Sequence, residues 1–79
     1  MAHIRYFAGA AEAASTTAET VPALTLGALK AALSHRHGAE FDRVLSRCSL
    51  LVNGTHTTDG AAPLTETDTV DVLPPFAGG

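Results

Sequence analysis

The sequence predicts an α+β protein with one mixed β-sheet and one principal helix lying across it. Short segments rich in β-forming residues lie near both ends of the chain, and the one long helical pattern, Leu26–His37, lies between them. A chain of 79 residues is the size of one domain. At this length only roughly 60–65% of the unfolded surface is buried, so the core must be small.

The N-terminal part is expected to contain two strands. His3–Phe7 alternates in polarity and is rich in β-forming residues, which predicts a strand that begins almost at the terminus. Ala8–Ala14 is alanine-rich with one glycine and predicts a loop or a short helical turn. Thr16–Val21 suits an exposed second strand that ends at Pro22.

The middle of the chain is expected to be helical. Over Leu26–His37, Thr25 is a suitable N-cap and Gly38 a suitable C-terminal stop, and three leucines at positions 26, 29 and 33 share one face. A second, shorter helix is expected over Phe41–Arg47, because apolar residues recur there at i, i+3, i+4 and i+7.

The C-terminal part predicts three further strands. Ser49–Val52 is apolar, and Asn53-Gly54 after it is a strong hairpin signal, because a type I′ turn needs positive φ twice. Thr55–Thr58 is the expected returning strand, and Thr69–Leu73 is the expected last strand. The remaining turns are expected at Asp59-Gly60 and over Thr65–Asp68.

This order of elements predicts the ubiquitin-like β-grasp fold. The first and last strands are short and apolar, so they would pair in parallel at the centre of the sheet, with the helical section as the crossover. We expect residues 1–73 to form the β-grasp domain and residues 74–79 to form a flexible C-terminal Gly-Gly tail.

Composition excludes several classes of protein. Five basic residues, four aromatic residues and a net charge of −3 do not make a nucleic-acid surface. No apolar run approaches the ~20 residues of a membrane span, and no signal peptide is visible. We therefore expect a soluble, cytoplasmic protein that binds neither nucleic acid nor membrane, and whose partners present a basic surface.

No catalytic or metal site is expected among the side chains. His35 and His37 are two residues apart and would point about 200° away from each other on a helix. Cys48, the single cysteine, excludes an internal disulfide, and it lies between an apolar helix face and an apolar strand, as a core residue does. No nucleophile elbow or phosphate-binding loop is present. The chain is expected to bind no cofactor or metal of its own.

The C-terminal tail is the candidate functional segment. Pro74 and Pro75 fix φ and favour an extended tail, and Phe76 is a large apolar residue suited to anchoring a partner. Ala77 follows, and Gly78 and Gly79 lack Cβ atoms and can enter a narrow channel. An α-carboxylate, whose pKa is near 3.5, is ionised at neutral pH. It can attack the α-phosphate of ATP held by another enzyme, and a sulfur donor can then displace AMP to leave a thiocarboxylate.

These residues resemble the molybdopterin synthase small subunits, a family of β-grasp sulfur carriers in molybdenum-cofactor biosynthesis. The resemblance rests on Arg5-Tyr6-Phe7-Ala8 with Glu12, on Val52-Asn53-Gly54, and on Asp68 to Pro75 followed by Gly78-Gly79. One departure is Ala11, where the family often has a basic residue before the acidic one.

The resemblance implies that Gly79 is adenylated with ATP by an E1-like enzyme and thiocarboxylated. It also implies that the tail then enters the large synthase subunit and gives sulfur to cyclic pyranopterin monophosphate. Two large and two small subunits form the family's usual heterotetramer, in which this chain is not catalytic alone.

Three other functions remain open. The chain is alternatively a sulfur carrier for thiamine or cysteine synthesis, although thiamine carriers tend to be shorter and lack the Tyr-Phe-Ala segment with its alanine-rich loop. A ubiquitin-like modifier would form isopeptide bonds through Gly79. A β-grasp interaction module with an inert tail would lose nothing on removal of Gly79.

Overall fold

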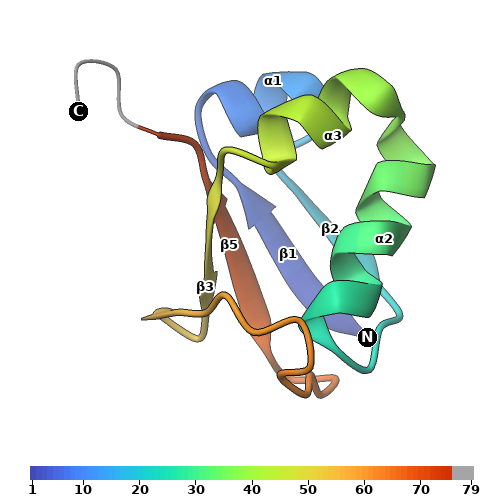
Figure 1. Cartoon of the computed structure of the whole chain (residues 1–79), viewed down its shortest axis with the longest axis vertical. Coiled ribbons are helices and arrows are strands. Elements are labelled where there is room, and N and C mark those ends of the chain that lie inside the picture. The colour runs from blue at the N-terminus through green and yellow to red at the C-terminus, as the bar shows by residue number, and fades with distance from the viewer. Residues whose placement is uncertain (76–79) are drawn as a thin grey trace.

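A computed structural model of the chain describes residues 1–75. One five-stranded sheet is covered on one face by the helices (Figure 1). The elements in chain order are β1 (Ala2–Tyr6), α1 (Gly9–Ala14), β2 (Ala18–Val21), α2 (Leu26–His37), α3 (Ala39–Leu45), β3 (Ser49–Val52), β4 (Thr55–His56) and β5 (Thr69–Leu73).

The strand order of the sheet is β2-β1-β5-β3-β4, so β5 lies at its centre. β1 and β5, the strands furthest apart in sequence, pair in parallel with Ile4 opposite Val70 and Tyr6 opposite Val72. The other neighbouring strands are antiparallel. The predicted β-grasp fold and the central parallel pair of first and last strands are confirmed.

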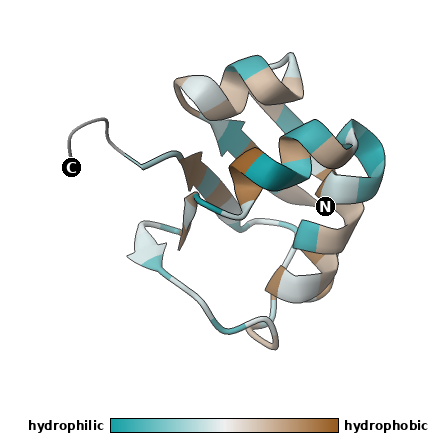
Figure 2. Cartoon of the chain, turned by 45° about the horizontal axis from the view of Figure 1, so that its top comes forward, coloured by the Kyte–Doolittle hydropathy of each residue, from teal (hydrophilic) through white to brown (hydrophobic). Residues whose placement is uncertain are grey.

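The core lies between the sheet and the helices. Along β1 every second residue is buried and the residues between them are exposed, so one face of the sheet packs inward and the other is open. Along the helices, hydrophobic and hydrophilic stretches are interspersed (Figure 2), and in α2 the buried residues Leu26, Leu29 and Leu33 share one face. The largest fully buried side chains are Phe41, Ile4, Leu26, Leu29, Leu33, Val21, Val70 and Val72.

α2 has the predicted boundaries. The side-chain oxygen of Thr25 accepts a hydrogen bond from the backbone N–H of Ala28 at 3.1 Å, as an N-cap does. Gly38 ends the helix at φ 92°, a value that favours glycine. The same residue precedes α3, so the two helices meet at a corner with only Gly38 between them.

The first turn of α2 explains a glycine that is unfavourable inside a helix. The backbone N–H of Gly27 donates to the carbonyl oxygen of Gly60 at 2.8 Å, and that of Leu26 donates to Ala62 at 2.9 Å. A Cβ at position 27 would lie 3.0 Å from the Gly60 oxygen. The loop after β4 therefore supplies acceptors that the first turn of a helix lacks, and it approaches closely enough to require glycine.

The Asn53-Gly54 turn is confirmed as type I′, with φ of 49° and 85°. Asn53 also ties the hairpin to β5, because its side chain donates to Asp68 and accepts from the backbone N–H of Thr69, both at 2.9 Å. The hydrogen bond from Asn53, followed by the backbone N–H of Thr65, lowers the pKa of Asp68.

Several boundaries differ from the predictions. Ala8–Ala14 contains a short helix, α1, and β1 covers Ala2–Tyr6 and not His3–Phe7, because Ala2 pairs with Val21. β2 begins at Ala18, two residues later than expected. α3 covers residues 39–45 and not 41–47, because Gly38 ends α2 and allows α3 to begin at once. β4 stops at His56, two residues before the expected end of the returning strand.

No helix within residues 1–75 is both long enough and apolar enough to cross a membrane.

Candidate functional site

The predicted tail begins where the central strand ends. Pro74 and Pro75 directly follow β5, and Leu73, the last residue of β5, pairs with Ser49. Figure 1 shows this end of β5 at the same end of the sheet as α1 and α3. Pro74 is half-buried and Pro75 is exposed. The candidate residues beyond them, Phe76, Ala77, Gly78 and Gly79, lie outside the described residues, and their roles stay predictions.

A groove of about 310 Å³ lies beside the start of the tail. α3 and the turn after it form one wall and the two prolines form the other, so we call it the α3–proline groove. Its lining residues are Glu40, Arg43, Val44, Arg47, Pro74 and Pro75. The groove is therefore apolar at Val44 and the prolines, and its charged lining residues are two exposed arginines and the exposed Glu40.

The open face of the sheet carries a second feature near the tail. Arg5 on β1 makes two hydrogen bonds to Asp71 on β5, of 2.6 and 2.9 Å. The hydrogen bond and then the charge of Asp71 raise the pKa of Arg5. The Arg5 guanidinium also lies 5.8 Å from the ring centroid of Phe7, which is 39% exposed. The sheet surface beside the tail is expected from the sequence to belong to the partner interface, and the alternation of β1 places Arg5 and Phe7 on one face.

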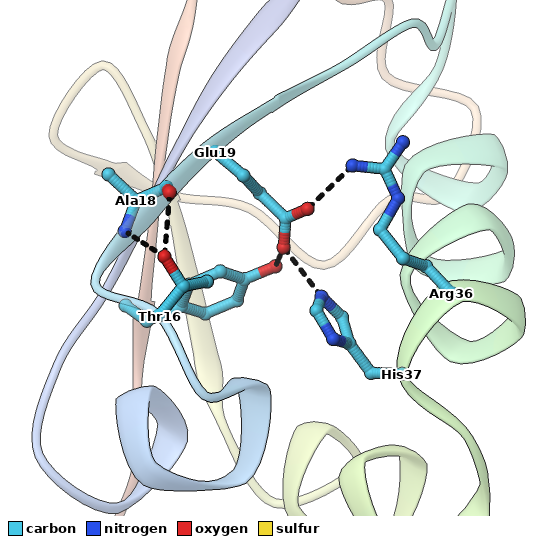
Figure 3. Close-up of polar contacts among 6 residues, drawn as sticks. Thr16, Ala18, Glu19, Arg36 and His37 are labelled. Carbon is cyan, nitrogen blue, oxygen red and sulfur yellow. Dashed lines mark hydrogen bonds and ion pairs between the residues drawn. The ribbon is translucent and has the colours of Figure 1, made fainter.

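A polar cluster joins the sheet edge to the end of α2 (Figure 3). Glu19 on β2 accepts hydrogen bonds from the hydroxyl of Tyr6 at 2.5 Å and from Arg36 at 2.6 Å. The Nε2 atom of His37 lies 2.5 Å from the same carboxylate oxygen that the Tyr6 hydroxyl contacts. Three donors from two elements thus converge on one carboxylate.

The environment of this cluster shifts two pKa values. Partial burial alone would raise the pKa of Glu19, but the hydrogen bonds from Tyr6, His37 and Arg36 outweigh burial and lower it. Burial, and then the hydrogen bond to Glu19, raises the pKa of Tyr6. The rings of Tyr6, His37 and Phe41 also contact one another, with centroids 4.8–6.0 Å apart. The cluster therefore fixes the corner between α2 and α3, and with it the position of the α3–proline groove.

Cys48 lies at the predicted junction of helix and strand, where it is half-buried against the core. Its thiol lies 3.1 Å from the carbonyl oxygen of Val44. Burial raises the pKa of the Cys48 thiol, which disfavours the reactive thiolate. The expectation of a packing role for Cys48 agrees with this environment.

The four histidines, all within residues 1–75, belong to no metal-binding cluster. Within residues 1–75 no group of three or more His, Cys, Asp or Glu side chains is placed to hold a metal ion. His37, the last residue of α2, is a partner of Glu19. Sequence spacing gave no sign of this contact, because Glu19 and His37 are 18 residues apart and belong to different elements.

Residues 4–79 match the ThiS family. A β-grasp domain whose central strand leads into a Pro-Pro and Gly-Gly segment is the architecture of a small carrier or modifier protein. The chain belongs to the ThiS family, a group of ubiquitin-like β-grasp proteins that includes sulfur carriers and modifiers. Comparison with curated protein sequences gives no significant match.

Solved structures share the fold over nearly the whole chain. SAMP1 from Haloferax volcanii is 25% identical with a TM-score of 0.83, and the match covers 99% of this chain and 98% of that one. A chain in the complex of subunits 1 and 2 of molybdopterin-converting factor from Helicobacter pylori is similar at 24% identity and a TM-score of 0.77, over 99% and 97% of the two chains. A putative molybdopterin-converting factor subunit 1 from Pyrococcus furiosus is 22% identical with a TM-score of 0.80, over 95% and 97%.

Proposed function

We propose that this chain is a sulfur carrier and the small subunit of molybdopterin synthase. The observation that carries the proposal is the place where the C-terminal segment begins. The central strand β5 delivers Pro74 and Pro75 to one end of the domain, and the sequence continues to Gly78 and Gly79. The family match extends through Gly79. One structural neighbour is described as a putative molybdopterin-converting factor subunit 1, and another belongs to a complex of subunits 1 and 2 of that factor.

The chemistry occurs at the Gly79 carboxylate. One carboxylate oxygen attacks the α-phosphate of ATP in an E1-like enzyme, and pyrophosphate leaves. A sulfur donor then attacks the acyl carbon and releases AMP, so that a thiocarboxylate remains. In the large synthase subunit this sulfur passes to cyclic pyranopterin monophosphate. The domain itself contributes binding and orientation. Its Cys48 thiol is a poor candidate for the sulfur chemistry, because burial raises its pKa and disfavours the thiolate.

The open face of the sheet is the second part of the proposed partner surface. Phe7 is a partly exposed aromatic residue on the face that leads to the tail, and Arg5 is held over it by Asp71. Aromatic and arginine side chains are enriched among residues that dominate binding energy. The large subunit would therefore contact the tail and this face together.

Reconstitution tests the proposal. Thiocarboxylated protein, purified large subunit and cyclic pyranopterin monophosphate should yield the dithiolene product, and chain lacking Gly79 should yield none while keeping its melting temperature. A folded protein that lacks Gly79 and still supports product formation would disprove a role for the terminus.

A protein modifier is the second candidate, and the similarity to SAMP1 favours it. Sulfur carriers for thiamine or cysteine synthesis remain a third. A modifier forms an isopeptide bond from the same acyl-adenylate. Arg47 is the last trypsin site of the chain, so tryptic peptides whose lysine carries residues 48–79 would identify that function. Thiocarboxylated protein that supplies a thiazole or cysteine synthase, but not the large subunit, would identify the third.

A further inference from the structure

The α3–proline groove contains basic charge that the described chain does not use. Of the five basic residues, Arg5 pairs with Asp71 and Arg36 pairs with Glu19. One guanidinium nitrogen of Arg43 lies 4.0 Å from a carboxylate oxygen of Glu40. The two side chains are 75% and 89% exposed, so this ion pair is weak. No ion pair to Arg47 forms within residues 1–75. Two guanidinium groups therefore remain available at one groove of a chain whose net charge is −3.

The groove also has an apolar part. Val44 is half-buried, and the rings of Pro74 and Pro75 form the opposite wall. A matching ligand must bring an apolar group between these walls and an anion to the rim. A guanidinium binds a carboxylate through two parallel hydrogen bonds, which makes the carboxylate a suitable anion.

The groove lies where any tail-binding enzyme must approach. Pro74 and Pro75 line the groove and are also the first residues of the tail. A protein that binds the tail and also contacts Pro74 and Pro75 therefore comes close to α3. The Glu19 cluster holds the corner between α2 and α3, so the groove wall is in position before the partner arrives.

We propose that the α3–proline groove is a docking site for an acidic segment of the enzyme that receives the tail. An apolar side chain of that segment packs on Val44 and the prolines, and a neighbouring Asp or Glu carboxylate binds Arg43 and Arg47. This inference rests on the proposed function and adds a contact that does not involve the terminal glycines. The groove holds the domain while the tail enters the active site.

The test compares two variants that change the net charge equally. Arg43→Gln with Arg47→Gln removes both rim charges, and Lys30→Glu changes the charge by the same two units on the exposed side of α2. Arg43→Lys with Arg47→Lys keeps the charge but not the forked geometry. ATP–pyrophosphate exchange with the E1-like enzyme and calorimetric binding to the large subunit are measured at low and high salt, with melting temperature as the folding control.

We expect the double glutamine variant to raise the KM for the carrier, or weaken binding to the large subunit, by about tenfold with kcat within about twofold. The difference should shrink at high salt. Lys30→Glu should stay near wild type, and the double lysine variant should fall between. Equal effects of the glutamine and Lys30→Glu variants, or no effect of either with both enzymes, would contradict the groove proposal alone.

Other outcomes separate this inference from the proposed function. If the wild-type chain supports neither exchange nor binding, both are wrong. Nuclear Overhauser contacts between Phe76 and Val44 in the free protein would show that the chain's own tail occupies the groove. Concentration-dependent dimerisation that the double glutamine variant abolishes would show a second copy there. Either of these last two results would overturn docking by a partner enzyme.

Discussion

Replacing Glu19 with alanine should destabilise the fold more than its position near a sheet edge suggests. The Glu19 carboxylate, 14% exposed, accepts from Tyr6 and Arg36 and lies against His37. Tyr6 is only 3% exposed, so its hydroxyl has no ready replacement partner when the carboxylate is removed. The substitution therefore leaves a buried donor unpaired at the junction of β1, β2 and α2.

The expected loss follows from the exposure of each partner. An unpaired buried hydroxyl costs about 1–3 kcal/mol. The Arg36 side chain is 47% exposed, so its pair with Glu19 contributes at most about 1 kcal/mol. We expect Glu19→Ala to lower the free energy of unfolding by about 2–3 kcal/mol, which for a domain of this size lowers the melting temperature by about 10–20 °C.

Urea and thermal unfolding followed by circular dichroism measure this loss. Glu66→Ala, at an exposed turn, is the matched control and should change stability by less than about 0.5 kcal/mol. In a Tyr6→Phe background no hydroxyl is left unpaired, so Glu19→Ala should cost only about 1 kcal/mol there. Equal losses in the two backgrounds would refute the assignment of the loss to the Tyr6 hydroxyl.

The same cluster sets a pH dependence. The pKa of Glu19 is lower in the folded protein than its ordinary value of 4.5, so folding favours the ionised form. Its stabilising contribution is present above pH 4.5 and is lost as pH falls through the lower folded pKa. Glu19→Gln should therefore show a shallower loss of stability below pH 4.5 than the wild type. Parallel stability curves for the two proteins would contradict this explanation.

The remaining predictions concern sulfur chemistry and the tail. Cys48→Ser should keep most sulfur transfer and lose some stability, because it places a hydroxyl where a half-buried thiol packs; a folded but inactive variant would move the chemistry from the terminus to this side chain. Phe76→Ala should weaken binding to the large subunit by about 1–3 kcal/mol with little change in melting temperature; a large fall in melting temperature with unchanged binding would show that the ring packs on the domain instead. Gly78→Val should block adenylation and transfer from synthetic thiocarboxylated protein, because a side chain would clash in both channels; wild-type rates in both assays would falsify the narrow-channel explanation.

Local sequence signals predicted most of the fold. The exact bounds of α2 follow from Thr25, three leucines on one face and Gly38, and each of these acts within a few residues of its own position. The Asn53-Gly54 turn is likewise a local requirement for positive φ. The parallel pairing of β1 and β5 was inferred from topology, since parallel strands need a crossover and the helices are the available one.

The missed features depend on contacts between segments far apart in the chain. Glycine lowers helix stability, and the reason for Gly27 inside α2 is the carbonyl of Gly60, which lies against it. His37 contacts Glu19 and Phe41, which belong to other elements. The α3–proline groove arises only when the end of β5 is placed beside α3. No periodicity or motif within one segment encodes such a juxtaposition. The tail was predicted as the site from the sequence, and residues 76–79 still rest on that prediction.

Intact mass spectrometry of the chain, co-expressed with its E1-like enzyme and a sulfur donor, tests the central claim most directly. The account predicts a mass increase equal to exchange of one oxygen for sulfur, located by fragmentation at Gly79 and absent when an extra residue follows Gly79. Cys48→Ser should show the same increase. An unchanged mass, or a sulfur atom located on Cys48, would contradict the claim that the terminal carboxylate carries the sulfur.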